Sequence, residues 1–118
     1  MTKVQMFNGE YLNETLEDLL GEIAISIEGR FPGCRVILFG SYAKGEYNKD
    51  SDVDICVLVP ELTRRRLEMS VDARGCIRDD FPLPIDVLLY TFDEFDMHSR
   101  HNSTIQNTIK REGVVLND

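Results

Sequence analysis

The sequence lacks any apolar run long enough to cross a lipid bilayer, which needs about 20 residues. Its N-terminal segment, MTKVQMFNGEYLNE, contains neither a long apolar region nor a cleavage-like site, so no secretory signal is predicted. The cysteines, Cys34, Cys56 and Cys76, are odd in number and share no C-x-x-C spacing. They are typical of buried free thiols, and the simplest interpretation is a reduced, cytoplasmic protein without a membrane anchor.

Basic residues are also scarce, because 13 lysines and arginines face 21 aspartates and glutamates, for a net charge of −8. This balance disfavours broad contact with DNA or RNA, so direct nucleic-acid binding is not expected. It favours a basic partner protein, or a small ligand held by metal ions. The 118 residues contain no repeat, low-complexity segment or linker, so we predict a single domain over residues 1–118.

Apolar spacing predicts alternating helices and strands. A first helix, carrying Leu16, Leu20 and Ile23 on its apolar face, is predicted to be capped by Asn13, or to start a turn earlier near Asn8. Further elements are predicted as strands over 36–39, 53–59 and 85–90, helices over 41–44, 62–76, 92–98 and 103–111, and a strand or extended tail over 113–116. This order indicates an α/β (α+β) fold with a small mixed sheet flanked by helices.

The first candidate site feature is Gly40-Ser41, directly after a predicted strand and at a predicted helix start. Free backbone N–H groups at such a corner favour a phosphate, and glycine lets the phosphate approach closely. The Ser41 hydroxyl adds a further donor. The alternative is that this corner is only a tight turn.

The second feature is the pair Asp52-x-Asp54 at the start of a predicted strand. Side chains at i and i+2 point to the same face of a strand. Two carboxylates side by side repel each other unless a cation joins them, and Mg²⁺ prefers such oxygen ligands. The alternative is that both acids simply end a strand in solvent.

The third feature is Asp86, an acid within the apolar run Pro84–Leu89. A carboxylate in such a strand needs a partner. If this strand lies beside the 53–59 strand, Asp86 joins Asp52 and Asp54, and three carboxylates could hold two metal ions. Asp86 could also accept the proton of an attacking hydroxyl. The alternative is a structural salt bridge at a sheet edge.

Ten residues separate Ser41 from Asp52, which gives the pattern GSx10DxD. This pattern resembles the signature of the DNA polymerase beta-like nucleotidyltransferase superfamily. The stretch 40–55 is similar to its minimal nucleotidyltransferase (MNT) branch, and Asp86 matches the third acid of that pattern in position and context. The resemblance spans about residues 36–90 and implies the nucleotidyltransferase fold.

The resemblance also implies roles for these residues. Gly40 and Ser41 would bind the triphosphate of ATP, the nucleotide substrate. Asp52 and Asp54 would hold Mg²⁺, and Asp86 would complete a second metal site and assist deprotonation of the acceptor. Lys44 stands where many relatives carry arginine, and lysine keeps the charge but not the bidentate fork. Lys44 is therefore either a nucleotide-binding residue or a solvated loop lysine.

Larger relatives add a helical domain that holds the acceptor, whereas only residues 92–118 follow the third predicted strand. We therefore expect another chain to supply the acceptor, in a homo- or hetero-oligomer. Small chains of this type resemble the MNT antitoxins of HEPN/MNT toxin–antitoxin pairs. There the MNT protein transfers AMP from ATP to a tyrosine of its HEPN partner, an RNase toxin. The alternatives are an antitoxin that neutralises its partner by binding alone, and a small-molecule (aminoglycoside-like) nucleotidyltransferase.

Overall fold

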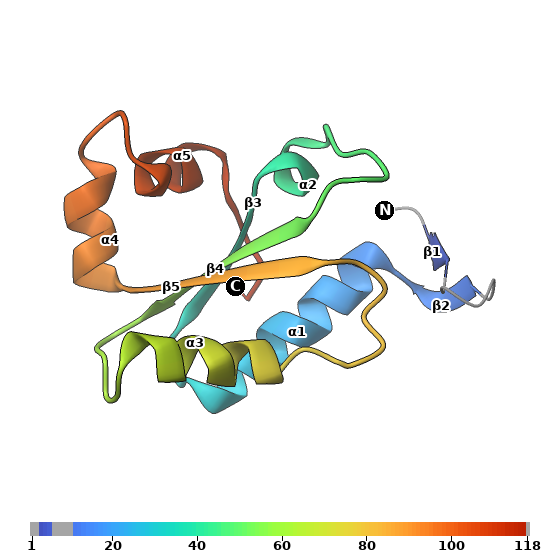
Figure 1. Ribbon diagram of the computed structural model, residues 1–118, viewed down its shortest axis with the longest axis horizontal. Helices are drawn as coiled ribbons and strands as arrows, with labels where there is room; N and C mark the ends of the chain where they lie inside the picture. The colour runs from blue at the N-terminus through green and yellow to red at the C-terminus, as the bar shows by residue number, and fades with distance from the viewer. Residues whose placement is uncertain (1–2, 6–10, 118) are drawn as a thin grey trace.

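The structure is a computed structural model that describes residues 3–5 and 11–117. Its elements are β1 (Lys3–Gln5), β2 (Tyr11–Thr15), α1 (Leu16–Arg30), β3 (Arg35–Phe39), α2 (Ser41–Lys44), β4 (Val53–Val59), α3 (Arg66–Gly75), β5 (Ile85–Thr91), α4 (Phe92–Ser99), α5 (Ile105–Glu112) and β6 (Val114–Val115). The main sheet has the strand order β5-β4-β3-β6, and β1 pairs with β2 in a separate antiparallel ladder (Figure 1). The predicted small mixed sheet flanked by helices is confirmed.

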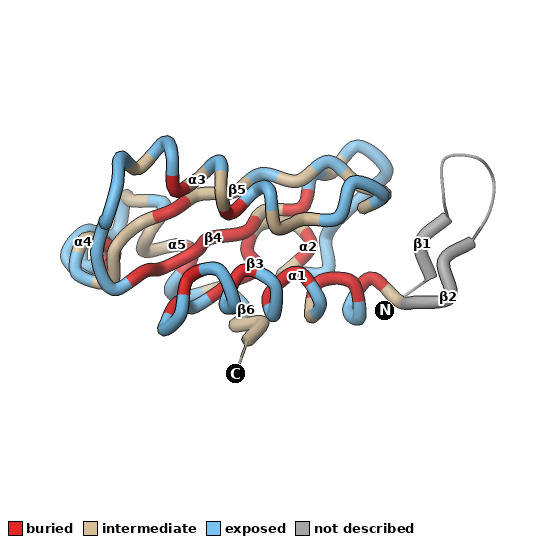
Figure 2. Tube along the Cα trace, turned by 90° about the horizontal axis from the view of Figure 1, so that it is seen from below, coloured by how far each residue is buried: buried red, intermediate tan, exposed pale blue. Residues whose placement is uncertain are grey.

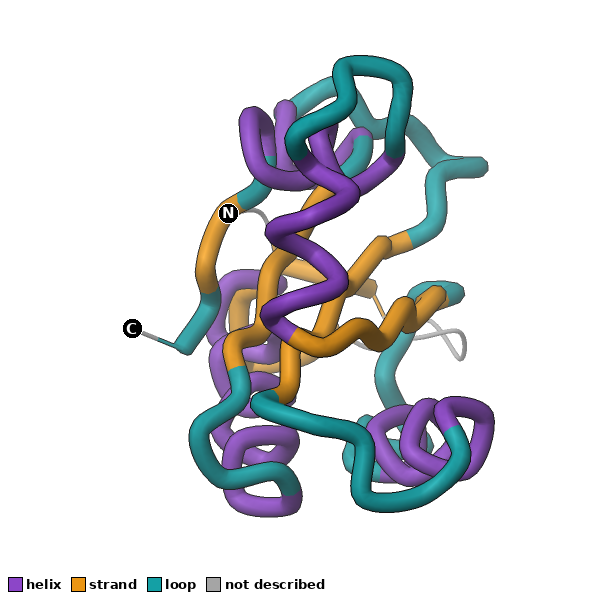
Figure 3. Tube along the Cα trace, turned by 90° about the vertical axis from the view of Figure 1, so that its left-hand side faces the viewer, coloured by secondary structure: helices purple, strands orange, loops and turns teal. Residues whose placement is uncertain are grey.

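The main sheet combines both kinds of strand pairing. β3 runs antiparallel to β4 and to β6, whereas β4 and β5 are parallel. The parallel pair is joined by α3, because parallel neighbours need a crossover connection, usually through a helix. Helices lie on both sides of the strands (Figure 3). The sheet therefore has two covered faces, each with its own apolar cluster.

One face of the sheet packs against α1 and α3, where Ile23 and Met69 meet Val57 of β4. The opposite face packs against α4 and α5, where Phe95 and Ile109 join a cluster with β4. Figure 2 shows buried residues running along β3, β4 and the inner side of α1. Among the described helices, none combines the length and the apolar character that a membrane span requires.

The first helix begins later than predicted. α1 starts at Leu16, and Thr15 caps it: its hydroxyl accepts a hydrogen bond from the Asp18 N–H, while the Asp18 carboxylate accepts one from the Thr15 N–H. This capping box satisfies otherwise unpaired donors at the helix start. The predicted cap at Asn13 is therefore wrong, because residue 13 lies in β2 and Thr15 is the cap, and Asn8 lies outside the described residues.

The helix after β4 is also shorter than predicted. α3 begins at Arg66, whereas the prediction began at Leu62. Residues 60–65 instead form the loop that carries the chain from the end of β4 to the helix layer. The remaining predicted helices and the three predicted strands agree with the structure to within two residues, and the C-terminal segment forms the short strand β6.

A half-buried ion pair ties α3 to α4. The Arg66 guanidinium donates hydrogen bonds to both carboxylate oxygens of Glu94 and to the Leu89 carbonyl oxygen. Glu94 also accepts a hydrogen bond from the Thr91 N–H in the capping box of α4. The hydrogen bonds from Arg66 and Thr91 lower the pKa of the Glu94 carboxyl to about 2.

Replacing Glu94 with glutamine is expected to destabilise the protein by about 1 kcal/mol near neutral pH, because glutamine retains the cap but loses the charge-assisted bond. A carboxyl with a lowered pKa stabilises the fold above its ordinary pKa of 4.5, and this contribution disappears as the pH falls toward about 2. Urea denaturation at several pH values should therefore show a Glu94→Gln deficit that vanishes in acid. The control is Asp18→Asn, which makes the same kind of change in the capping box of α1. Among the described residues, no arginine forms an ion pair with Asp18, so this variant loses no charge-assisted bond.

Candidate active site

The residues singled out from the sequence meet at one end of the main sheet. Gly40 directly follows β3, Asp54 is the second residue of β4, and Asp86 is the second residue of β5. The register pairs Phe39 with Asp54 and Asp54 with Asp86. In Figure 1 this end of β4 and β5 lies on the same side of the molecule as α2 and is the end of the sheet farther from α4. β5 therefore lies beside β4, which was the condition for Asp86 to join the other two acids.

The two strand carboxylates share one face of the sheet. Side chains two residues apart on a strand point to the same face, so Asp54 shares a face with Cys56 and Asp86 shares one with Leu88. Cys56 and Leu88 both face the α4–α5 side of the sheet. Asp52 lies one residue before β4 and is exposed. The loop leading to it is closed by hydrogen bonds between Asn48 and Ser51. Three acids thus gather at this end of the sheet, where Asp86 and Asp52 are near enough to act on the charge of Asp54.

Gly40 is required by the position of Asp54. A Cβ added at Gly40 would stand 2.3 Å from the Asp54 Oδ2 atom, far inside van der Waals contact. The backbone at Gly40 also has a φ of 76°, which L-residues with side chains rarely adopt. The Asp54 carboxylate therefore occupies the space that any other residue at position 40 would fill.

The electrostatic environment of Asp54 disfavours its negative charge. Burial raises the pKa of the Asp54 carboxyl above its ordinary value, and the charges of Asp86 and Asp52 raise it further. Within the described part of the chain, none of the three carboxylates has a hydrogen bond or an ion pair with another side chain. An arrangement of uncompensated acids is costly, and such perturbed groups concentrate at functional sites.

These acids fit a divalent cation by the chemistry of their donor atoms. Mg²⁺ prefers carboxylate oxygens and retains room for phosphate and water ligands, which suits carboxylates that no basic side chain neutralises. Among the described residues, no group of three or more acidic, histidine or cysteine side chains is placed so that it could hold a metal ion. The donor chemistry of the three carboxylates therefore matches a divalent cation, and a metal site at these acids stays a prediction that goes beyond their arrangement in the structure.

The short helix α2 presents backbone donors beside these acids. The first backbone hydrogen bond of α2 runs from the Lys44 N–H to the Gly40 carbonyl oxygen, at 3.2 Å. The preceding N–H groups, including that of Ser41, belong to the first turn, where no partner exists within a helix. Ser41 is half-buried. Both Gly40 and Ser41 thus lie where a phosphate could accept hydrogen bonds.

A hollow of about 290 Å³ opens next to this corner. Its walls come from the β3–α2 segment and from α5, through Phe39, Gly40, Ser41, Lys44, Glu46, Ile105, Thr108 and Glu112. Lys44 lies at its wall and forms ion pairs with Glu46 at 3.6 Å and Glu112 at 3.7 Å. The hollow therefore offers a cationic group within an otherwise acidic region.

The contribution of α5 was missed by the sequence reasoning. Ile105, Thr108 and Glu112 are spaced by three and four residues, so the sequence places them on one helix face. Nothing in that spacing shows that the face turns toward α2, because the placement depends on how β6 pairs with β3. A lysine partner for Glu112 was therefore not predictable.

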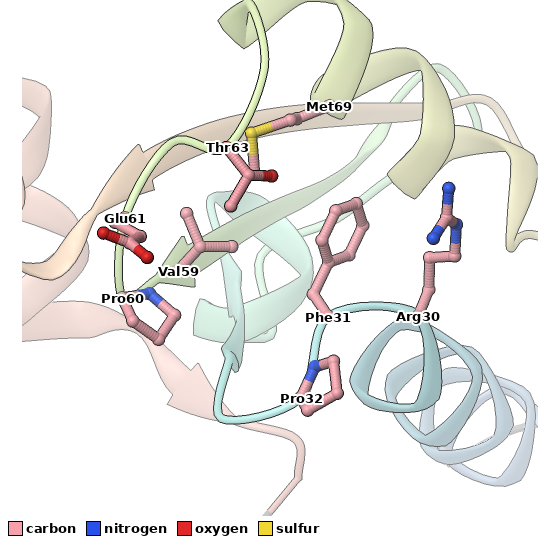
Figure 4. A pocket seen from close by; sticks show the side chains of 8 residues that line it. All are labelled: Arg30, Phe31, Pro32, Val59, Pro60, Glu61, Thr63 and Met69. Atoms are coloured by element: carbon pink, nitrogen blue, oxygen red, sulfur yellow. The ribbon is translucent and has the colours of Figure 1, made fainter.

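A second hollow, of about 240 Å³, lies at the other end of β4 (Figure 4). Phe31 and Met69 line its apolar wall, and Arg30 stands at its rim. It includes none of the acids, Gly40 or Ser41. The chemistry predicted from the sequence is thus confined to the end of the sheet beside α2.

Comparison with known proteins identifies the family. Residues 20–113 match the family model described as the nucleotidyltransferase domain. The chain therefore belongs to the nucleotidyltransferase domain family, and its mixed sheet with the acids at one end is the nucleotidyltransferase fold.

A protein of Methanocaldococcus jannaschii with the provisional name protein adenylyltransferase is 40% identical over 55 residues, 47% of this chain and 52% of the relative. The match thus spans about half the length of that protein. A Sulfolobus solfataricus structure provisionally described as a nucleotidyltransferase superposes with a TM-score of 0.57 at 22% identity, covering 85% of this chain and 78% of the other. A structure described as a toxin–antitoxin with AMP-PNP superposes with a TM-score of 0.51 at 24% identity, covering 89% of this chain and 73% of the other. Both structures share the fold.

Proposed function

We propose that this chain transfers AMP from ATP to a hydroxyl group of a partner protein, in a Mg²⁺-dependent reaction. The observation that carries the proposal is the register of Asp54 with Asp86, with Gly40 packed against the Asp54 carboxylate. A tyrosine of a HEPN-type RNase toxin is the proposed acceptor, which makes the chain an antitoxin. The M. jannaschii relative, with its provisional protein adenylyltransferase name, supports a protein acceptor.

The reaction joins the acceptor oxygen to the α-phosphorus of ATP. The bond between that phosphorus and the bridging oxygen breaks, and pyrophosphate leaves with the electron pair. Gly40 and Ser41 bind the triphosphate through backbone N–H groups and a hydroxyl, and Lys44 provides a positive charge. Asp86 accepts the acceptor's proton, because it is exposed on the same face as Asp54.

Asp52, Asp54 and Asp86 are the residues that would hold Mg²⁺, and two ions are proposed. When bound, the metal supplies charge stabilisation for the transferring phosphoryl group. The three carboxylates would fix the position of the metal's positive charge and thereby orient the bound substrates. Burial raises the pKa of Asp54, and repulsion from Asp86 and Asp52 raises it further, so a bound cation would relieve an unfavourable charge at this position.

Mg²⁺ and ATP are expected to bind together. Saturating Mg²⁺ with ATP should stabilise the protein against heat by about 2–3 kcal/mol, whereas ATP with a chelator should give little stabilisation. Differential scanning fluorimetry with each ligand alone and with both tests this expectation. Asp54→Asn should lose the Mg²⁺-dependent part, while Glu28→Gln, the same charge change at an exposed α1 residue, should keep it. Equal stabilisation with and without chelator would contradict the metal assignment.

The direct test of function uses labelled ATP, this chain and the protein encoded beside it, which we propose to be a HEPN-type RNase toxin. The expected result is label attached to the partner, and mass spectrometry should place it on tyrosine. An Asp52→Asn variant that still protects cells from the partner's toxicity would instead favour neutralisation by binding alone. Absence of label on any protein from the wild-type chain would overturn the proposed transfer.

A further inference from the structure

The strand that carries Asp86 lies at an open edge of the main sheet. β5 is the first strand in the order β5-β4-β3-β6, so only one of its sides is paired within the described part of the chain. Its residues are mostly half-buried, in contrast with those of β4 (Figure 2). An edge strand presents backbone N–H and C=O groups that can pair with another extended chain.

The direction of those groups follows from the hydrogen bonds at the start and end of β5. The Val53 N–H of β4 donates to the Pro84 carbonyl oxygen, so residue 84 and every second residue after it face β4. The Leu89 carbonyl oxygen instead accepts from the Arg66 side chain at 3.0 Å. Ile85, Val87 and Leu89 therefore direct their backbone groups outward, because these groups alternate along a strand.

Only part of this outer edge is covered. The Arg66 side chain donates one hydrogen bond to the Leu89 carbonyl oxygen and another to the Glu94 carboxylate. The C-terminal end of the β5 edge is therefore already paired with a side chain. No described residue forms a hydrogen bond with the outward backbone groups of Ile85 or Val87. The N-terminal half of the edge is thus open over the residues that flank Asp86.

The open half of the edge is continuous with the candidate active site. Asp86 lies between Ile85 and Val87, and its side chain shares a face with Asp54. A strand added outside β5 would lie about 5 Å away, with every second side chain on that same face. One of those side chains would stand directly beside the Asp86 carboxylate, where the acceptor hydroxyl has to lose its proton.

The charge of this region indicates which kind of segment fits. Asp86 is exposed, and so is Asp79 in the loop that leads to β5, and neither forms an ion pair with a described residue. The whole chain has a net charge of −8. An extended segment with lysine or arginine beside its acceptor residue would complement this edge.

We propose that the N-terminal half of the β5 edge, Ile85 to Val87, binds an extended basic segment of the partner protein as an added strand. The added strand presents its acceptor hydroxyl to Asp86. This inference rests on the proposed transfer reaction and specifies how the acceptor reaches the site. Recognition would come from main-chain hydrogen bonds, as in other cases of strand addition.

Val87→Pro tests the proposal, because proline removes an outward N–H without removing a hydrogen bond to β4, and edge strands tolerate proline. Val87→Ala, which loses the side chain but keeps the N–H, is the matched control. Relative to the control, Val87→Pro should lower the rate of AMP transfer to the HEPN-type partner about tenfold or more. Binding of Mg²⁺ and ATP should be the same in both variants. Equal transfer by the two variants would overturn the proposal.

Amide hydrogen exchange in the wild-type chain provides a measurement that does not depend on how the proline variant folds. The Ile85 and Val87 amides should exchange at least about tenfold more slowly when the partner is present. Unchanged exchange in a complex that transfers AMP would overturn strand addition and leave the proposed function intact. Protection that appears without the partner and grows with protein concentration would also overturn it, because the edge would then pair with a second copy. If the wild-type chain binds the partner but transfers nothing, the proposed function fails, and the exchange result still decides the edge.

Discussion

Replacing Asp54 with asparagine is expected to lower the rate of AMP transfer by at least about 10³-fold, because a metal-binding carboxylate contributes several kcal/mol to the transition state. Asparagine is nearly isosteric with aspartate, so the space beside Gly40 should remain filled. The loss should therefore appear in catalysis and in Mg²⁺-dependent binding of ATP, with the fold unchanged. Single-turnover assays with labelled ATP measure the rate, and circular dichroism checks the fold.

The same variant should be more stable than the wild type. A carboxyl with a raised pKa stabilises the fold fully only below its ordinary value of 3.8, and this stability is lost as the pH rises through the folded pKa. Asp54→Asn removes that loss of stability. Its free energy of unfolding should therefore exceed that of the wild type by about 1 kcal/mol near neutral pH and equal it in strong acid. Glu28→Gln should change neither stability nor transfer, since Glu28 lies exposed on α1. An Asp54→Asn variant that is inactive and clearly less stable would contradict this assignment of Asp54.

Gly40→Ala is the second change with a large expected effect. The new Cβ would meet the Asp54 Oδ2 atom at 2.3 Å and its Cγ atom at 3.3 Å. The backbone at this position, with φ 76° and ψ −156°, lies in a region that is essentially restricted to glycine. We expect a loss of about 2–3 kcal/mol in the free energy of unfolding. Transfer should fall about 10²-fold, because displacement of a catalytic group by 1 Å has effects of that size.

Gly45 provides the matched control for this substitution. It also has a positive φ, 72°, but an added Cβ there would have no atom within 4 Å. Gly45→Ala should therefore show the backbone cost of about 1–2 kcal/mol without loss of transfer. Urea denaturation and labelled-ATP assays of both variants compare a positive-φ glycine that contacts Asp54 with one that has no neighbour within 4 Å. Equal transfer by the Gly40→Ala and Gly45→Ala variants would show that contact with Asp54 is unimportant.

The central strands and the arrangement of the acids could be predicted from the sequence because their signals are local. Apolar runs over 36–39 and 53–59 gave the buried strands, and the i, i+2 spacing of Asp52 and Asp54 gave a shared face. The position of Asp86 within an apolar run indicated a carboxylate that needs a partner but left open whether its strand lies beside β4, and the register with Asp54 shows that it does. The roles of these residues in metal binding and catalysis remain predictions.

Other features depend on contacts between distant segments, which local patterns do not encode. The pairing of β1 with β2 was missed, since neither short segment shows a strong alternation of apolar residues. The helix start at Thr15 was misplaced because the apolar spacing continues back to Leu12, whereas the capping box decides where the helix begins. Neither the contact of Gly40 with Asp54 nor the ion pair of Lys44 with Glu112 has a sequence signal.

The most direct test of the proposed transfer is a side-by-side reaction of wild-type, Asp54→Asn and Glu28→Gln chains with α-labelled ATP, Mg²⁺ and the HEPN-type partner. Wild type and Glu28→Gln should attach labelled AMP to the partner at equal rates and release pyrophosphate, while Asp54→Asn leaves the partner unlabelled. Equal labelling by Asp54→Asn, or no labelling by a wild-type chain that binds Mg²⁺, ATP and the partner, would contradict the assignment of this site as a nucleotidyltransferase centre.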